Sequence, residues 1–315
     1  MTRLFIDGSV GTTGLEIRER IAGRTDIELI TLDEAQRKQA SARRDALNAA
    51  EIVILCLPDD AAKEAVSLID NATTKVIDAS TAHRTAPGWV YGFPEFKAGQ
   101  YDRILASSRI SNPGCYSTGF LALMAPLVAQ GLLKADWQYS CNAVSGYSGG
   151  GKSMIAAYED ANAADAIDSA WRTYALKLGH KHVPEMQHQA GLGYRPLFTP
   201  AVVPTYRGMV VEVPLQVGAA GCASADALRD GLAAHYAGRK LVRVASKVEC
   251  EGMDWLPVET SAECDRVDLF VFSSDQQDQV RLIATLDNLG KGAGGAAVQT
   301  MNLLMGVDEA TGLRA

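Results

Sequence analysis

The feature that most constrains the fold is a glycine loop that follows a short apolar strand at the start of the chain. Residues 3–6 have the composition of a buried strand, and the loop after them carries Gly8, Gly11 and Gly14. The apolar spacing from Leu15 to Ile21 then predicts a helix. A strand, a glycine turn and a helix in this order are typical of the first unit of a doubly wound sheet. There the turn holds a pyrophosphate against the helix N-terminus.

Further strands and helices alternate over the first 110 or so residues. Short apolar runs at 26–32, 51–57 and 76–78 are of the kind found in buried parallel strands. Strands alternating with helical segments favour a Rossmann-type, doubly wound parallel sheet. The loop spacing, G-x-x-G-x-x-G, departs from G-x-G-x-x-G, so the argument for a dinucleotide depends on this context.

The texture of the sequence changes at about Trp137. Longer strand-like segments follow at 202–203, 209–217, 241–249 and 267–273, and 290–305 resembles a final helix. We therefore predict an α/β chain of two domains. A dinucleotide-binding domain spans 1–114 and is joined by a C-terminal helix at 290–315, and an α+β catalytic and dimerisation domain with a mixed sheet spans 115–289.

Composition limits the classes of partner. The 315 residues carry a formal net charge of −7, which argues against nucleic acid and acidic membranes as partners. The six cysteines are scattered without a C-x-x-C pair, so we expect neither a metal site nor a disulfide framework. No apolar run reaches the length of a membrane span, and the N-terminus begins directly in a strand-like run. We expect a cytoplasmic protein.

A cysteine placed after Pro-Gly is the strongest indication of chemistry. In Ser111-Asn112-Pro113-Gly114-Cys115-Tyr116 the cysteine precedes an apolar run with helical spacing. Unpaired N–H groups and the positive end of the helix dipole would there favour a thiolate, the attacking form of cysteine. The alternative is a buried and inert thiol.

A histidine pair is the second indication. His180 and His182 stand two positions apart ahead of Pro184-Glu185, and in an extended segment they would point to the same side. One of them could take up and return a proton in a mechanism that uses a thiolate. The alternatives are a surface pair or a weak metal site, and Glu185 could orient a histidine or form an ion pair.

Other segments carry groups that suit an anion. The small-residue loop 142–152 ends in Lys152 and could approach a ligand with its backbone, although a plain linker is the alternative. Arg84 follows a predicted strand end, where ligands of doubly wound sheets bind. Asp33 suits the ribose of NAD, but the cations that follow it could accept the 2′-phosphate of NADP. They are Arg37, Lys38, Arg43 and Arg44.

Taken together, these motifs resemble the N-acetyl-gamma-glutamyl-phosphate reductases of arginine biosynthesis, most closely their shorter form. The resemblance covers nearly the whole chain. It rests on the glycine loop, Ser80-Thr81-Ala82-His83-Arg84, Pro113-Gly114-Cys115-Tyr116, residues 142–152, His180-Lys181-His182-Val183-Pro184-Glu185 and Asp287-Asn288-Leu289-Gly290-Lys291-Gly292-Ala293. The family is similar in fold to aspartate-semialdehyde dehydrogenase. This chain lacks the Cys-Thr-Thr-Asn type of nucleophile context.

The resemblance implies a role for each motif. It implies Cys115 as nucleophile and one histidine of the pair as acid/base, with His182 favoured over His180. The residues that it implies for binding the cofactor are Gly8, Ser9, Gly11, Thr12, Thr13, Gly14, Ser80, Asn288 and Lys291. Near the substrate it implies Arg84, Asn112, Ser145, Lys152 and Glu185. The implied cofactor is NADP, with NAD not excluded because of Asp33.

The implied reaction is the NADPH-dependent conversion of N-acetyl-L-glutamyl 5-phosphate into N-acetyl-L-glutamate 5-semialdehyde through a thioester on Cys115. The partner is then a small acyl phosphate, and a homo-oligomer, dimer or tetramer, is expected. One alternative is the same chemistry on an aminoadipate derivative or aspartyl phosphate. Others are a non-catalytic dinucleotide sensor and a plain alcohol or hydroxy-acid dehydrogenase that needs no cysteine.

Overall fold

The computed structural model describes residues 1–315, which divide into two compact units. Unit 1 consists of Met1–Pro94, Ala98–Gly114 and Ala293–Leu313, and unit 2 of Glu95–Lys97, Cys115–Gly292 and Arg314–Ala315. Cys115 is thus the first residue of the long segment that forms most of unit 2. None of the helices combines the length and the apolar character that crossing a membrane requires.

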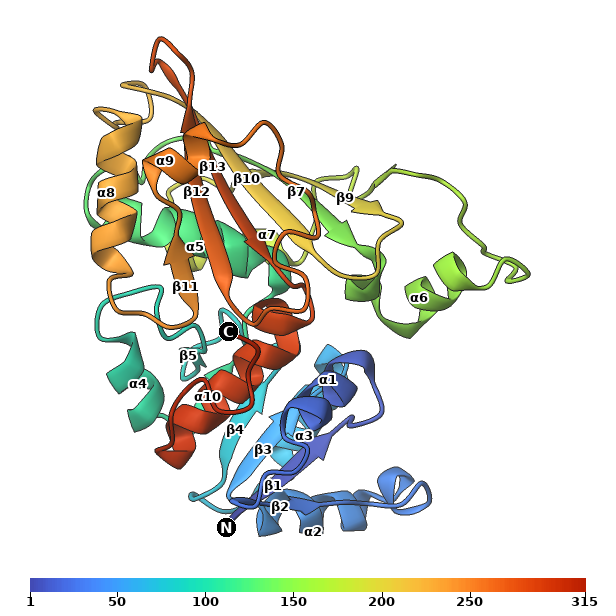
Figure 1. The fold of residues 1–315 in the computed structure, drawn as a ribbon. Helices are drawn as coiled ribbons and strands as arrows, with labels where there is room; N and C mark the ends of the chain where they lie inside the picture. The colour runs from blue at the N-terminus through green and yellow to red at the C-terminus, as the bar shows by residue number, and fades with distance from the viewer. The chain divides into compact units, whose positions relative to one another are not determined.

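Unit 1 is built on a six-stranded parallel sheet with the order β2-β1-β3-β4-β6-β5 (Figure 1). Its strands are β1 (Thr2–Asp7), β2 (Ile27–Ile30), β3 (Ile52–Leu55), β4 (Lys75–Asp78), β5 (Val90–Tyr91) and β6 (Arg109–Ser111). Its helices are α1 (Thr12–Arg20), α2 (Ala40–Ala49), α3 (Asp59–Ser67), α4 (Gln100–Ala106) and α10 (Gly295–Met305), with a 3₁₀ turn at Gln36–Lys38.

Helices cover both faces of this sheet because the strands are apolar on both faces. On one face Leu4 of β1 packs in a cluster with Ile17 of α1 and Val298 of α10. On the other face Phe5 of β1 packs in a cluster with Leu47 of α2. Successive strand residues point to opposite faces, so the continuous apolar runs of the sequence supply both cores. The predicted doubly wound sheet is confirmed.

The carboxyl ends of the central strands lie side by side. The register pairs Asp7 with Leu55, Leu55 with Asp78, and Asp78 with Ser111. The loops that follow β1, β3, β4 and β6 therefore leave the sheet at one edge. This is the edge at which doubly wound sheets bind their ligands.

Unit 2 is built on a seven-stranded mixed sheet with the order β11-β12-β13-β10-β7-β9-β8 (Figure 1). Its strands are β7 (Ser140–Gly146), β8 (Arg172–Thr173), β9 (Leu197–Val203), β10 (Met209–Gln216), β11 (Val242–Val244), β12 (Val267–Ser273) and β13 (Gln279–Leu286). Its helices are α5 (Cys115–Ala129), α6 (Gly151–Glu159), α7 (His182–Ala190), α8 (Ala225–His235) and α9 (Lys247–Glu251), with a 3₁₀ turn at Tyr147–Gly150.

Helix α5 is the central element of unit 2. It is apolar all round, and Phe120 through Leu127 are buried without interruption. A helix of that kind needs cover on every side. It packs against α7, α8 and strands β10 and β13, and the strands pass in front of it in Figure 1. The nucleophile candidate Cys115 thus begins a helix that is held firmly by its surroundings.

Two segments differ from the sequence prediction. The strand expected at 241–249 ends at Val244, because Ser246 and Glu249 form a capping box that starts α9. The C-terminal helix expected at 290–315 is shorter: α10 begins at Gly295 and ends at Met305, and a short π-helical segment, Gly290–Gly294, precedes it. Segments of this type are rare and are often found at functional sites.

Candidate active site

The glycine loop between β1 and α1 forms a tight turn. Gly8 has φ of +88°, a conformation that side chains other than glycine's rarely adopt. The N–H of Gly11 donates to the carbonyl of Gly8 at 2.9 Å, and a Cβ on Gly14 would lie 2.6 Å from the same carbonyl oxygen. The loop therefore has room for backbone only. Thr12 and Thr13 open the helix behind it, so this cradle fits a pyrophosphate.

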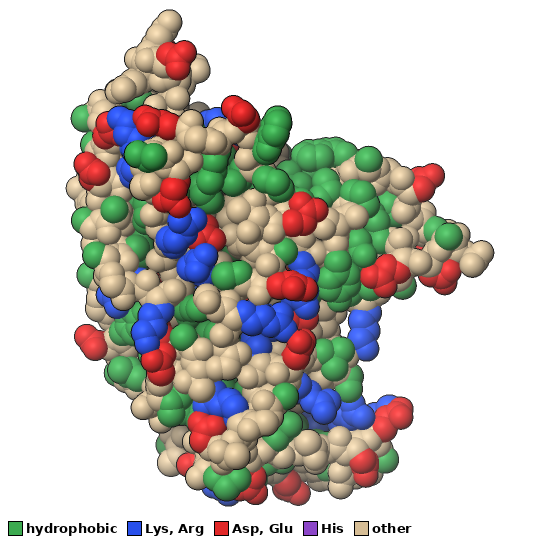
Figure 2. Space-filling model, in the orientation of Figure 1, with side chains coloured by type: hydrophobic (Ala, Val, Ile, Leu, Met, Phe, Trp, Pro, Cys, Tyr) green, Lys and Arg blue, Asp and Glu red, His purple; other side chains and the backbone are tan.

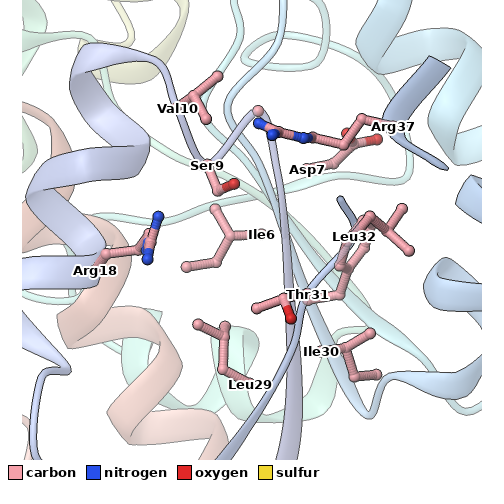
Figure 3. A pocket seen from close by; sticks show the side chains of 12 residues that line it. Ile6, Asp7, Ser9, Val10, Arg18, Leu29, Ile30, Thr31, Leu32 and Arg37 are labelled. Carbon is pink, nitrogen blue, oxygen red and sulfur yellow. The ribbon is translucent and has the colours of Figure 1, made fainter. Parts of the chain in front are cut away.

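A pocket of about 220 Å³ adjoins this loop (Figure 3). The end of β1, the glycine loop, α1 and the end of β2 supply its walls. The polar members of the lining are Ser9, Arg18, Thr31, Arg37 and Asp7, and the carboxylate of Asp7 is paired with Arg43. In Figure 3 the side chains of Arg18 and Arg37 lie on opposite sides of Ser9. The pocket thus has a hydroxyl between two cations and suits an anionic group.

The carboxylate of Asp33 is engaged elsewhere. Its Oδ1 accepts the backbone N–H of Gln36 at 2.7 Å, and Asp33 does not line the pocket. Of the cations that follow it in the sequence, Arg43 pairs with Asp7 at 2.9 Å, while Lys38 and Arg44 pair with exposed carboxylates. Arg37 is the member of this set that lines the pocket.

The loop after β4 is organised by a buried carboxylate. Asp78 Oδ2 accepts the hydroxyl of Ser80 at 2.7 Å and lies 2.6 Å from Nδ1 of His83. The His83 ring stacks on Trp89 with centroids 4.0 Å apart. Ser80, which the resemblance assigns to the cofactor, is therefore held in place by Asp78 at the carboxyl edge of the sheet.

Arg84 and Asn112 join neighbouring loops of unit 1. Arg84 is buried, and it donates to the carbonyl of Asn112 at 3.1 Å and to that of Ala79 at 3.2 Å. The Nδ2 of Asn112 donates to the carbonyl of Ala293 at 3.0 Å, and its buried Oδ1 has no hydrogen-bond partner. Their assignment to the substrate stays a prediction. The geometry adds that Arg84 fixes the loop just before Pro113.

Cys115 is the partly exposed first residue of α5, and Gly292 packs directly on it. A Cβ on Gly292 would lie 2.9 Å from the Cβ of Cys115, which leaves space for glycine alone. Next to this glycine, Nζ of Lys291 lies 2.8 Å from a carboxylate oxygen of Glu95, and both side chains are fully buried. Lys291, which the resemblance assigns to the cofactor, is thus neutralised inside unit 2.

The two histidines lie against the residue that follows the nucleophile. The ring of Tyr116 is 5.8 Å from the ring of His180 and 5.8 Å from that of His182. Nδ1 of His180 accepts the backbone N–H of His182 at 3.1 Å, so the neutral His180 ring carries its proton on Nε2. Glu185 is buried in the first turn of the same helix, α7.

The other residues assigned by resemblance lie around the loop from β7 to α6. Asn288 accepts the N–H of Gly208 at 3.0 Å and donates to the hydroxyl of Ser148 at 2.8 Å. Ser145 is buried and donates to the carbonyl of Gly146 at 2.9 Å. Lys152 is exposed in the first turn of α6. Asn288 and Ser145 therefore shape this part of unit 2 from within.

Unit 2 thus gathers Cys115, Tyr116, the histidine pair and Ser145, which come from motifs far apart in the sequence. Sequence reasoning missed Tyr174, whose hydroxyl donates to that of Tyr116 at 3.0 Å, and Glu95, the partner of Lys291, because each is a single residue outside any motif. Gly292 could have been singled out, since it lies in the Asp287–Ala293 motif. Arg18, in the last turn of α1, lines the pocket beside the glycine loop, but it belongs to none of the motifs from which the site was predicted.

Three of the remaining cysteines differ from Cys115 in their surroundings. Burial raises the pKa of Cys56 to about 12, and it also raises the pKa of Cys141 and of Cys264 above the ordinary value. These groups stay protonated at neutral pH and are poor nucleophiles. Cys115 differs from them in its place at a helix N-terminus.

Comparisons with known proteins agree along the whole chain. Residues 6–104 match the family model of the semialdehyde dehydrogenase NAD binding domain, and residues 115–288 match that of the semialdehyde dehydrogenase dimerisation domain. Among solved structures, aspartate semialdehyde dehydrogenase II of Vibrio cholerae, complexed with ASA, is similar with a TM-score of 0.74 at 16% identity. That match covers 97% of this chain and 98% of the other. It supports the same fold.

Curated relatives are more similar in sequence. N-acetyl-gamma-glutamyl-phosphate reductase of Brucella ovis is 49% identical over 306 residues, which cover 96% of this chain and 99% of the relative. The protein of the same name from Brucella canis matches over the same length at the same identity. This chain, an oxidoreductase with a domain for a nicotinamide dinucleotide, belongs to the semialdehyde dehydrogenase family and, within it, to the N-acetyl-gamma-glutamyl-phosphate reductases.

Proposed function

We propose that this chain reduces N-acetyl-L-glutamyl 5-phosphate to N-acetyl-L-glutamate 5-semialdehyde and phosphate, with Cys115 as nucleophile. The observation that carries the proposal is the constellation in unit 2. Cys115 opens α5, Gly292 packs on it, and the histidine pair lies against the adjacent Tyr116. The names of the relatives supply the substrate, and the constellation supplies the chemistry.

Cys115 performs the covalent step. Its thiolate attacks the acyl carbon, the carbon–oxygen bond to phosphate breaks, and a thioester forms while phosphate leaves with the electron pair. The N–H groups of the first turn of α5 can stabilise the oxygen that becomes negatively charged, because the first turn of a helix carries donors without a partner inside the helix. When bound, the nicotinamide cofactor supplies the hydride that reduces the thioester carbon.

His182 is the group that we assign to proton transfer. The hydride step leaves a thiohemiacetal oxygen that must gain a proton and later lose it as the carbon–sulfur bond breaks. His180 cannot take up a proton on Nδ1 without losing the backbone N–H of His182, which that atom accepts. His180 is therefore the poorer base. It can donate from Nε2, which suits stabilisation of the same oxygen.

The pocket of unit 1 supports NADP over NAD. A 2′-phosphate needs cations, and Arg18 and Arg37 line the pocket together with Ser9. A ribose 2′-hydroxyl would need an acceptor such as Asp33, whose carboxylate is instead bonded to the backbone of Gln36. The charge of the pocket and the position of Asp33 both favour the phosphorylated cofactor.

One assay tests the substrate and the cofactor together. The reverse reaction is followed with NADP or NAD, in the presence of phosphate, using the semialdehydes of N-acetylglutamate, of an N-substituted aminoadipate and of aspartate. We expect the highest kcat/KM with N-acetylglutamate semialdehyde, and about tenfold or more in favour of NADP, the effect of one charged hydrogen bond. A preference for another semialdehyde would make that compound, and not N-acetylglutamate semialdehyde, the substrate. Cofactor binding without turnover would favour a non-catalytic sensor.

We also propose that the chain forms a homo-oligomer, a dimer or tetramer. Residues 115–288 match a dimerisation domain, and large apolar side chains of this region are exposed. They include Trp171, Leu176, Leu178, Tyr194 and Leu197. Figure 2 shows apolar side chains gathered on the part of unit 2 that carries β7 and β9. A contiguous apolar surface of this kind is typical of an interface.

A further inference from the structure

The residue after the nucleophile is a buried tyrosine that forms a wall for both histidines. Only 4% of Tyr116 is exposed, and its ring packs on the rings of His180, His182 and Phe198. Because Tyr116 and Cys115 are consecutive in the first turn of α5, a rotation of this ring would change the space between the nucleophile and the histidines. The position of the Tyr116 ring therefore bears on the distance between the proposed nucleophile and the proposed proton donor.

A second tyrosine fixes that position. The hydroxyl of Tyr174 donates to the hydroxyl of Tyr116 at 3.0 Å, and the hydroxyl of Tyr116 donates to the carbonyl of Ala201 at 3.4 Å. The Tyr174 ring also lies 5.7 Å from the ring of His180. A chain of hydrogen bonds thus runs from Tyr174 through Tyr116 to the backbone of β9.

The backbone of Tyr174 is itself tied to β9. Its N–H donates to the carbonyl of Pro200 at 3.2 Å, and the preceding Thr173 pairs with Ala201 in the β8–β9 ladder. Strand β9 therefore holds the backbone of Tyr174 and also accepts the hydrogen bond of the Tyr116 hydroxyl. This closed arrangement leaves Tyr116 little freedom to move.

Both phenols remain protonated under assay conditions. Burial raises the pKa of Tyr116 and of Tyr174 well above the ordinary value near 10, and the negative charge of a Cys115 thiolate adds to the effect on both. Neither hydroxyl therefore changes its charge near neutral pH. Their contribution is to orientation, and both lie within electrostatic range of the Cys115 sulfur.

We propose that Tyr174 is a positioning residue of this active site, which acts through the hydroxyl of Tyr116 on the spacing of Cys115 and the histidine pair. The inference rests on the proposed roles of Cys115 and His182. Loss of the Tyr174 hydroxyl leaves one acceptor site of Tyr116 empty and allows its ring to shift. Small displacements of reacting groups lower the rate more than they change binding.

The test compares Tyr174→Phe with wild type. Tyr101→Phe is the matched control, because it removes one tyrosine hydroxyl bond, to Glu309 at 3.0 Å, in unit 1. We expect kcat of Tyr174→Phe to fall about five- to tenfold, the range expected for one hydrogen bond, with each KM within about twofold. The decrease should be the same at every pH, since the removed group does not titrate there. Unchanged kcat, or a loss shared by Tyr101→Phe, would overturn the inference.

A double variant tests whether Tyr174 acts through Tyr116. If it does, Tyr116→Phe/Tyr174→Phe loses no more rate than Tyr116→Phe alone, because the second change removes a donor that no longer has its acceptor. Losses that multiply would show independent action and would overturn the proposed route.

A readout without turnover separates this inference from the proposed function. With only five histidines in the chain, histidine-selective NMR resolves individual ring signals. Tyr174→Phe should move the signals of His180 and His182, whereas Tyr101→Phe should leave them in place. If wild type oxidises no semialdehyde, the proposed function fails, and unmoved histidine signals would then overturn the positioning role as well.

Discussion

At the scale of single residues, two side chains of opposite charge point to different cofactors in the sequence, and their hydrogen-bond partners in the fold distinguish between the two. Asp33 and Arg37 both follow β2, and spacing alone favours neither NAD nor NADP. In the folded chain Asp33 caps the turn at Gln36, and Arg37 lines the pocket. Sequence could not predict this because the choice depends on local hydrogen bonds of a short 3₁₀ turn.

Replacing Arg37 by glutamine tests the assignment. We expect Arg37→Gln to raise KM for NADP about 10- to 100-fold and to leave KM for NAD nearly unchanged, since the lost bond is made to the 2′-phosphate alone. Steady-state kinetics with both cofactors measure the effect. Arg44→Gln is the control, because Arg44 pairs with Asp70 on the surface. An equal loss with both cofactors would contradict a 2′-phosphate contact.

At the scale of elements, the π-helical segment Gly290–Gly294 holds a glycine against the nucleophile. Its Lys291 is paired with Glu95 in the interior, while Gly292 packs on Cys115. The resemblance implies that Lys291 binds the cofactor. In the fold its ammonium pairs with buried Glu95, and this ion pair holds the segment in place. A lysine without local partners in the sequence gives no indication of such a pair, since Glu95 lies far away along the chain.

Breaking this pair should destabilise unit 2. Glu95→Gln leaves the Lys291 ammonium buried without a carboxylate, and we expect a loss of about 3–5 kcal/mol in the free energy of unfolding. Glu95→Leu/Lys291→Met removes both charges and should recover most of it. Urea unfolding measures both effects. A Glu95→Gln protein as stable as wild type would show that the pair does not hold the segment.

At the scale of the whole molecule, the alternation of strands and helices was enough to predict the doubly wound sheet of unit 1. Strands β1 to β4 each carry an apolar run, so local pattern and final position agree there, whereas the short strands β5 and β6 carry no such run and were not predicted. The elements of unit 2 were harder to predict. A capping box at Ser246 starts a helix where the second half of an expected strand would lie. Of the candidate site, sequence supplied the motif residues. It could not supply Tyr174 or Glu95, which only the fold brings to them.

Assembly is a property of the whole molecule as well. If the exposed apolar residues of unit 2 form the interface between copies, a charge at Leu197 should weaken it. We expect light scattering to give a dimer or tetramer mass for wild type and a smaller species for Leu197→Glu. The exposed Leu105 of unit 1 offers the control variant Leu105→Glu. A monomeric wild-type protein would contradict the proposed oligomer.

The central claim is that the reaction passes through a thioester on Cys115, and a burst experiment tests it most directly. Semialdehyde and NADP are mixed with the enzyme without phosphate, so that the thioester forms but has no acceptor other than water. We predict a rapid burst of about one NADPH per site, then turnover when phosphate is added. We expect no burst from Cys115→Ser, because the buried thiols of Cys56 and Cys141 have raised pKa values and cannot replace it. A burst that persists in Cys115→Ser, or sustained NADPH formation without phosphate, would contradict the account.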